Sequence, residues 1–187
     1  MKIYRFISSE DYAIVKVVSK GMHLLTFDRL FVKESHRKWS EKIRLGIVEE
    51  DSKPNKLVGD FPYYAGYQPI VVSQRAVDKI GDVLNDNGAL YQVEIEGHNE
   101  PFYYYAVTNI VDCLNQEKST LRSVNSPSVN YINVTRPAFL KKRIGSNSIF
   151  VLPEHPDGPI YVTEVFANIL KESNLEGYDL IPEHRGA

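Results

Sequence analysis

The sequence predicts an α+β fold with a mixed or mostly antiparallel sheet, two strand-to-helix units and a small, mainly β N-terminal region. Most apolar runs are short and alternate with polar residues, as half-buried strands do. Two segments, PIVVSQRAVDKI from Pro69 and PIYVTEVFANIL from Pro159, instead pass from strand character to helical spacing. Because the strands are short and follow one another closely along the chain, we expect mainly antiparallel pairing.

Composition indicates an ordinary globular protein of one domain, or of one domain with a small appendage. The chain has 187 residues, of which 43% are hydrophobic and 25% charged. Its net charge of -2 provides no general attraction for nucleic acid or an anionic membrane. We therefore expect neither as a partner.

The predicted location is the cytoplasm. The N-terminal segment has no apolar run long enough for a secretory signal, and no stretch approaches the roughly 20 apolar residues of a membrane helix. The single cysteine, Cys113, excludes an intramolecular disulfide and fits a reducing compartment.

Residues 1–58 form the predicted N-terminal region. Strand spacing is found in KIYRFI, YAIVKVV and IRLGIV, and the polar segment EEDSKPNK then indicates a loop. We interpret residues 59–187 as an α+β domain, with one continuous domain over the whole chain as the alternative.

The first strand-to-helix unit places Ser73 as the N-cap of a helix. Gly81 within this helix lowers helix propensity, so we expect it to be packed closely against a neighbour. The helix should end at NDNG. Its apolar side is predicted to hold Ala76, Val77, Ile80, Val83 and Leu84.

The second unit repeats this design 90 residues later, since 163 − 73 = 90. Thr163 is the predicted N-cap, and Glu164 is placed favourably at the positive end of the helix dipole. YDLIP is predicted to follow as a strand. The buried side of this helix should hold Val165, Phe166, Ile169 and Leu170.

Between the two units, YQVEIE and FYYYAV predict a β-hairpin, and VNYINV and SIFVL predict further strands. Glu94 and Glu96 share one face of a strand by period-2 spacing, with Val93 and Ile95 on the other. This alternation is typical of a half-buried strand. It could also place two carboxylates for acid–base chemistry, but a solvated face is the simpler interpretation.

Neither strand-to-helix turn has the glycines of a nucleophile elbow or a phosphate-binding loop. The five histidines show no zinc-ligand spacing. Cys113 lies in an apolar run, where a buried and unreactive thiol is usual. We therefore expect no catalytic residue, no cofactor and no bound metal.

Tyrosine is the one compositional excess that points to function, with twelve residues in the chain. Tyrosine is common at protein interfaces because it combines a large, stiff surface with a polar tip. In FYYYAV, cross-strand packing explains the cluster. In FPYYAGY, Pro62 and Gly66 indicate a loop, and we predict that Tyr63, Tyr64 and Tyr67 contact a partner.

Three blocks carry a resemblance to a known family: YQPIVVSQRAVDKIGDVL, YAVTNIVDCLNQEKS and SIFVLPEHPDGPIYVTEVFANILKESNLEGYDLIP. Their order resembles that of bacterial immunity proteins from polymorphic toxin systems, over about residues 60–182. The resemblance implies a cytoplasmic protein that binds and neutralises a cognate toxin without a cofactor. It brings no catalytic residues.

Two alternatives to a binding protein stay open at this point. An enzyme whose site is assembled only by folding leaves no motif in the sequence. A structural or nucleic-acid-binding component is the other alternative. A pocket with convergent polar groups would favour the enzyme, whereas a broad surface of tyrosines and acidic residues would favour binding.

Overall fold

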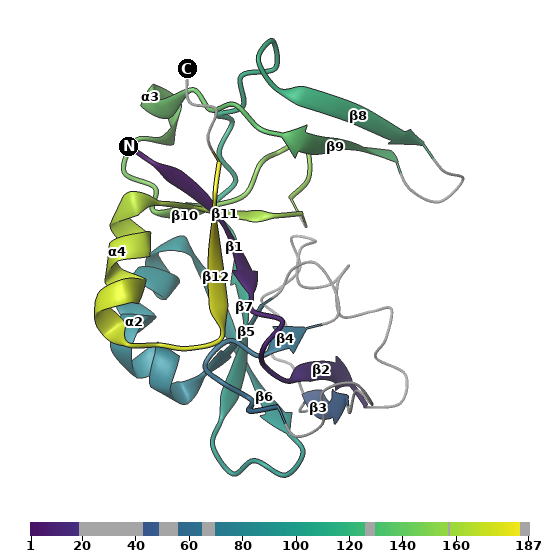
Figure 1. Cartoon of the computed structure of the whole chain (residues 1–187), viewed down its shortest axis with the longest axis vertical. Helices are drawn as coiled ribbons and strands as arrows, with labels where there is room; N and C mark the ends of the chain where they lie inside the picture. The colour runs from purple at the N-terminus through teal and green to yellow at the C-terminus, as the bar shows by residue number, and fades with distance from the viewer. Residues whose placement is uncertain (19–42, 49–55, 65–69, 126–129, 157, 184–187) are drawn as a thin grey trace.

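The computed structural model describes residues 1–18, 43–48, 56–64, 70–125, 130–156 and 158–183. Within these ranges the chain forms two larger β-sheets, a separate β-hairpin and three helices (Figure 1). Both parallel and antiparallel strand pairs occur, and antiparallel pairs predominate. The predicted α+β fold with a mixed, mostly antiparallel sheet is confirmed.

The largest sheet has the strand order β4-β2-β3-β6-β7-β5. Its edge strands β4 and β5 contact each other, so the sheet curls around its own apolar core. The predicted hairpin is β6–β7, and Val93 and Ile95 are buried while Glu94 and Glu96 face outward. The strands span Ile14–Val17 (β2), Ile43–Val48 (β3), Tyr63–Tyr64 (β4), Ile70–Ser73 (β5), Gly88–Ile95 (β6) and Phe102–Val107 (β7).

The second sheet brings the two ends of the chain together. Its order is β10-β11-β1-β12, and the first strand pairs antiparallel with both of its neighbours. Phe6, for example, lies opposite Ile160 on one side and Leu180 on the other. The strands span Ile3–Ser8 (β1), Ile149–Phe150 (β10), Ile160–Thr163 (β11) and Tyr178–Pro182 (β12).

Strands from before and after residue 58 share both sheets, because β1 pairs with β11 and β12, and β3 pairs with β6. An N-terminal unit that folded alone would leave these strands without their neighbours. We therefore propose that the chain is one continuous domain.

Helices α2 (Gln74–Asn87) and α4 (Glu164–Ser173) contact each other and cover one side of the sheets (Figure 1). Helix α2 buries Ala76, Ile80 and Leu84, as predicted. It ends within NDNG, at Asn87, and Gly88 begins strand β6. Gly81 is not closely packed, because an added Cβ would meet only Val77 of the same helix, at 3.4 Å. That prediction was wrong.

Helix α4 buries Phe166, Ala167 and Leu170, but Val165 is 59% exposed. The prediction that Val165 is buried was therefore wrong. The buried stripe is centred on Phe166 and Leu170, and a residue one position earlier is turned by about 100° around the helix axis. The Val165 side chain therefore points toward solvent and not into the core.

The two helix N-termini differ in how they are capped. Ser73 has extended backbone angles, and its Oγ accepts a hydrogen bond from the amide of Ala76 at 3.0 Å, which confirms the predicted cap. Thr163 occupies the same position, but its hydroxyl makes no capping hydrogen bond, contrary to the prediction. There the amide of Glu164 donates to the backbone carbonyl of Lys2 at 3.0 Å, so a neighbouring chain segment satisfies it.

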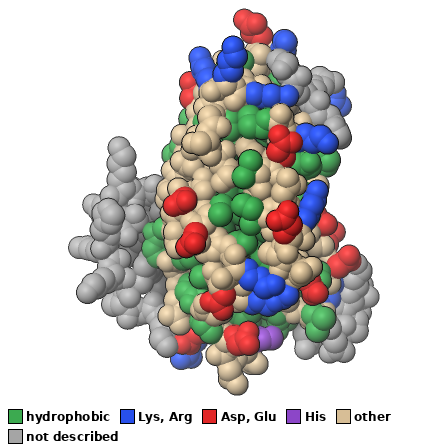
Figure 2. All heavy atoms as spheres, turned by 90° about the vertical axis from the view of Figure 1, so that its left-hand side faces the viewer, with side chains coloured by type: hydrophobic (Ala, Val, Ile, Leu, Met, Phe, Trp, Pro, Cys, Tyr) green, Lys and Arg blue, Asp and Glu red, His purple; other side chains and the backbone are tan. Residues whose placement is uncertain are grey.

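The hairpin of β8 (Thr120–Asn125) and β9 (Asn130–Arg136) forms a sheet of its own. It extends from the body at the end of the molecule that also carries the short helix α3 (Lys141–Ile144) (Figure 1). At its base lies a third apolar core. In Figure 2, which faces α2 and α4, acidic and basic side chains are mixed over the molecule, and several Lys and Arg side chains gather at that end.

Candidate protein-binding surface

The predicted contact tyrosines begin in a strand, not in a loop. Tyr63 and Tyr64 form β4, which pairs in parallel with β2 so that they lie opposite Ile14 and Val15. The amide of Tyr63 donates to the carbonyl of Ala13 at 3.0 Å. The loop expected from Pro62 and Gly66 is therefore wrong for these two residues, because β2 offers a backbone partner that the local sequence does not reveal. Tyr67 lies outside the described residues.

Tyr64 is anchored to the core of the curled sheet. Its ring meets that of Tyr104 edge-on, with 5.3 Å between centroids and 67° between planes. Tyr104 is completely buried, and burial is the main cause that raises the pKa of its phenol. Tyr64 therefore has a structural role in addition to any contact it makes.

Tyr63 lies on the opposite face of the strand, because successive side chains alternate. It is half-buried and makes no ring contact or side-chain hydrogen bond with a described residue. Its phenol is therefore partly exposed, and its hydroxyl has no hydrogen-bond partner among the described residues. Of the two described tyrosines, Tyr63 is the better placed to meet a partner.

The segment before β4 is held firmly by Asp60. This carboxylate is 5% exposed and accepts hydrogen bonds from Ser73 Oγ at 2.7 Å, Arg75 Nη1 at 2.7 Å and the amide of Glu176 at 2.9 Å. Asp60 thus joins the entrance of β4 to the N-terminus of α2 and to the turn after α4. The tyrosines are presented from a rigid base.

Tyr12 is a further tyrosine near the segment that leads into β4, and the sequence did not indicate it. Its ring packs on Gly59, where an added Cβ would lie 2.4 Å from Tyr12 Cδ1. Its hydroxyl donates to Glu176 Oε2 at 3.3 Å, and burial, followed by the charge of Glu176, raises the pKa of this phenol. Tyr12 directly precedes Ala13, which pairs with Tyr63. The backbone contact between Ala13 and Tyr63 holds the segment that contains Tyr12 against the start of β4, and no local sequence signal could have revealed it.

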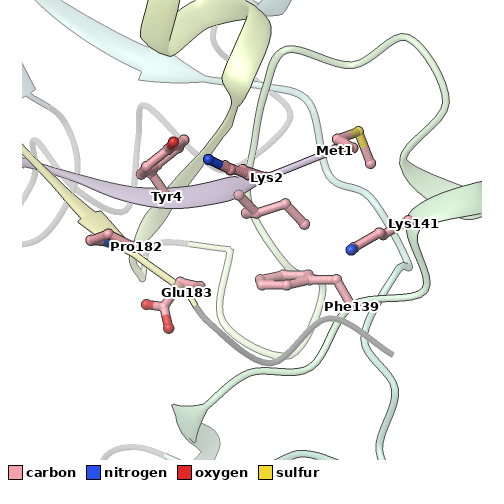
Figure 3. A pocket seen from close by; sticks show the side chains of 8 residues that line it. Met1, Lys2, Tyr4, Phe139, Lys141, Pro182 and Glu183 are labelled. Atoms are coloured by element: carbon pink, nitrogen blue, oxygen red, sulfur yellow. The ribbon is translucent and has the colours of Figure 1, made fainter.

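Two shallow hollows lie elsewhere on the surface. One, of about 350 Å³, is lined by Phe139 and Lys141 among others, and the ammonium of Lys141 points into it while that of Lys2 lies beside Tyr4 (Figure 3). Glu183, also at this hollow, pairs with Arg5 at 3.6 Å. The charged groups of Lys2, Lys141 and Glu183 therefore lie apart and do not converge on one point.

The second hollow, of about 480 Å³, lies at the turn of the β6–β7 hairpin and is lined by Glu94, Glu96, Glu100, Arg44 and His98. Arg44 pairs with Glu94 at 3.6 Å. Among the described residues, no three of His, Cys, Asp and Glu are close enough together to hold a metal ion. The glutamates of this hollow thus form a solvated acidic face.

The remaining chemical candidates, Ser73 and Cys113, are both buried. Ser73 Oγ is buried between Asp60 and the amide of Ala76. Cys113 is fully buried, and burial raises the pKa of its thiol to about 12, so the reactive thiolate is suppressed at neutral pH. The predicted helix cap at Ser73 is confirmed, as is the burial of the Cys113 thiol.

Comparison with known protein families identifies the family of this chain. The model of an immunity protein family (Imm11) matches residues 7–183, which includes most of the N-terminal residues that the sequence blocks did not cover. No curated protein matches the chain. In the part of the chain that the structure describes, no helix combines the length and the apolar character needed to cross a membrane.

Proposed function

The chain belongs to the Imm11 family of immunity proteins, and from that premise we propose that it binds a cognate bacterial toxin in the cytoplasm and neutralises it by protein–protein contact. The observation that carries the proposal is the family match over nearly the whole chain. Contact, not catalysis, is the proposed means of neutralisation. The toxin would belong to a polymorphic toxin system.

The surface around β4 supports this proposal. Tyr63 and Tyr64 of β4 and Tyr12, which precedes β2, are half-buried tyrosines, and Asp60 fixes the segment that leads into β4. Aromatic residues on a rigid base lose little conformational freedom when they are covered by a partner. A stable complex should bury on the order of 1,200–2,000 Å² in total and concentrate its affinity in a few such anchors.

The test is co-expression with the toxin encoded by the neighbouring gene. Growth should be rescued by this chain and not by an immunity protein from an unrelated system, and the two proteins should elute as one complex. The toxin should then be released in denaturant, separated and refolded. Recovered toxin activity supports neutralisation by contact, whereas an inactive toxin of altered mass would show that the chain is an enzyme. A chain that neither binds nor protects against that toxin would contradict the proposal.

A further inference from the structure

The β8–β9 hairpin presents an outer strand edge, an apolar face and a basic face. We propose that the outer edge of β8 is a docking site for an extended segment of the partner toxin in which apolar residues alternate with acidic ones. This inference rests on the proposed immunity function. It concerns residues Thr120–Ser123 and their neighbours Ile132–Arg136 on β9.

The first observation is that the hairpin stands alone. Strands β8 and β9 pair only with each other among the described strands, so each has an outer edge without a β partner. A two-stranded sheet is at best marginally stable in water, and an edge with free N–H and C=O groups accepts an added strand. Here the body supports only the base, where Ser119 Oγ accepts from the amide of Ala138 at 2.9 Å.

The two edges are not equivalent. The register places Thr120 opposite Arg136 and Leu121 opposite Val134, so Thr135 is an extra residue that makes a bulge in β9. A bulge disrupts regular pairing and protects an edge from further strands. Strand β8 has no such irregularity from Leu121 onward, and it therefore offers the regular edge.

One face of the hairpin is apolar. Residues directly opposite each other share a face, which places Leu121 with Val134 and Ser123 with Ile132. Val134 packs against the core at the base of the hairpin, but Leu121 is 36% exposed and Ile132 is 37% exposed. Apolar side chains of an added strand would cover these two residues.

The other face is basic. Arg122 and Arg136 lie there, opposite Asn133 and Thr120 respectively, and both are exposed. Residues 118–143 contain six Lys and Arg residues and no Asp or Glu, in a chain of net charge -2. Among these cations, Arg143 pairs with Asp112 at 3.0 Å, whereas Arg122 and Arg136 have no carboxylate partner among the described residues. Charge complementarity therefore requires acidic side chains on this face.

These features together specify the occupant. Side chains of a strand added to β8 alternate between the two faces, so the segment needs apolar residues beside Leu121 and acidic residues beside Arg122. A nucleic acid would also meet the positive charge, but the two exposed apolar residues that an added strand would cover, Leu121 and Ile132, are aliphatic and offer no ring on which a base could stack. Strand β4 and the hairpin both lie on the side of the molecule away from α2 and α4 (Figure 1).

The test does not need the toxin. The ¹⁵N-labelled full chain is titrated with a blocked peptide of alternating Val and Glu, with the matched peptide of alternating Val and Lys, and with an oligothymidylate. The Val–Glu peptide should shift the amides of β8 most and bind roughly tenfold more tightly than the Val–Lys peptide. Arg122→Glu should reverse this preference. Lys142→Glu, the same charge change on α3, should leave the Val–Glu peptide preferred.

Several results would overturn the inference. These are equal binding of both peptides, shifts centred outside β8, no shift at millimolar peptide, or stronger binding of the oligothymidylate to the same amides. In the co-expression assay, Arg122→Glu combined with Leu121→Ser should lose protection. If the wild type protects and this variant protects equally, the hairpin proposal fails while the immunity function stands. If the wild type does not protect, the immunity function fails, and the peptide titration still decides the chemistry of the edge.

Discussion

Asp60 and Ser73 are joined by two hydrogen bonds, one between side chains and one between backbones. Ser73 Oγ donates to Asp60 Oδ1 at 2.7 Å, and the amide of Ser73 donates to the carbonyl of Asp60 at 2.9 Å. The same Oγ accepts from the amide of Ala76. The residue that caps helix α2 thus also fixes the chain segment that leads into β4.

Replacing Ser73 with alanine should lower the free energy of unfolding by about 1–2 kcal/mol, because both the cap and the bond to Asp60 are lost. Thr163→Val is the matched control, since it removes a hydroxyl that makes no capping hydrogen bond. It should change stability by less than about 0.5 kcal/mol. Urea unfolding of both variants measures the difference. Equal losses would show that the cap at Ser73 contributes nothing.

Asp60→Ala should be more damaging, with a loss of roughly 3–5 kcal/mol, because it removes a buried carboxylate and leaves the donors of Ser73 and Glu176 without an acceptor. Arg75 is the partner that reaches solvent, with a side chain 48% exposed. Arg75→Ala should cost less than Asp60→Ala, about 1–3 kcal/mol, because the buried carboxylate loses one cation but keeps the donors of Ser73 and Glu176. Chemical denaturation compares the two. An Asp60→Ala variant as stable as Arg75→Ala would mean that the buried hydrogen bonds are unimportant.

Two glycines should respond to alanine in opposite directions. Gly59 has φ +61°, and an added Cβ would lie 2.4 Å from the ring of Tyr12, so Gly59→Ala should lower the melting temperature by several degrees. Gly81 lies within helix α2 with room for a methyl group. Gly81→Ala should raise stability by up to about 1 kcal/mol through helix propensity. Differential scanning calorimetry tests both, and a stabilised Gly59→Ala variant would contradict the described packing.

Alkaline pH should destabilise the fold. Burial raises the pKa of Cys113 from 9.0 to about 12, and burial also raises the pKa values of Tyr105 and Tyr161. A raised pKa means that the folded state holds the proton more tightly, so the stabilisation is complete below the unfolded value of 9.0 and is lost toward about 12. The melting temperature should fall over this pH window.

The same burial should protect Cys113 from a thiol reagent. At pH 8 the native protein should react with Ellman's reagent far more slowly than the protein unfolded in guanidinium. Rapid labelling of the native protein would show that the thiol is accessible.

The sequence predicted local structure well where one residue's preference decided it. The alternation of Val93 and Ile95 with Glu94 and Glu96 gave the faces of β6 correctly, and Ser73 marked the start of α2. It could not predict pairing between distant segments. The parallel pairing of β2 with β4 depends on contacts across about fifty residues, and it turned an expected loop into a strand and placed Ala13 beside Tyr63.

Two predictions failed at helix α4. Val165 fits an amphipathic pattern, but the direction of the buried stripe was set by packing of α4 against α2 and the sheets. Thr163 has the residue type and backbone of a cap, but its hydroxyl makes no capping hydrogen bond, and the structure offers no reason for this. At Val165, tertiary contacts decided between options that the local sequence left equal.

Alanine substitutions at Tyr63 and Tyr64 should have different effects on toxin binding and on stability. Tyr64 packs against the buried ring of Tyr104, so Tyr64→Ala should lower the free energy of unfolding by about 2–4 kcal/mol through loss of the ring and of its aromatic contact. Tyr63 lies on the other face without a ring contact among the described residues, so Tyr63→Ala should change stability by less than about 1 kcal/mol. In a binding assay with the toxin encoded by the neighbouring gene, Tyr63→Ala should nevertheless weaken affinity by tenfold or more, about 1.4 kcal/mol or above, as the loss of an aromatic anchor does. Tyr63→Phe, which keeps the ring and removes the hydroxyl, should retain most of the affinity if the ring supplies the contact. A Tyr63→Ala variant that binds the toxin as tightly as the wild type would remove β4 from the interface.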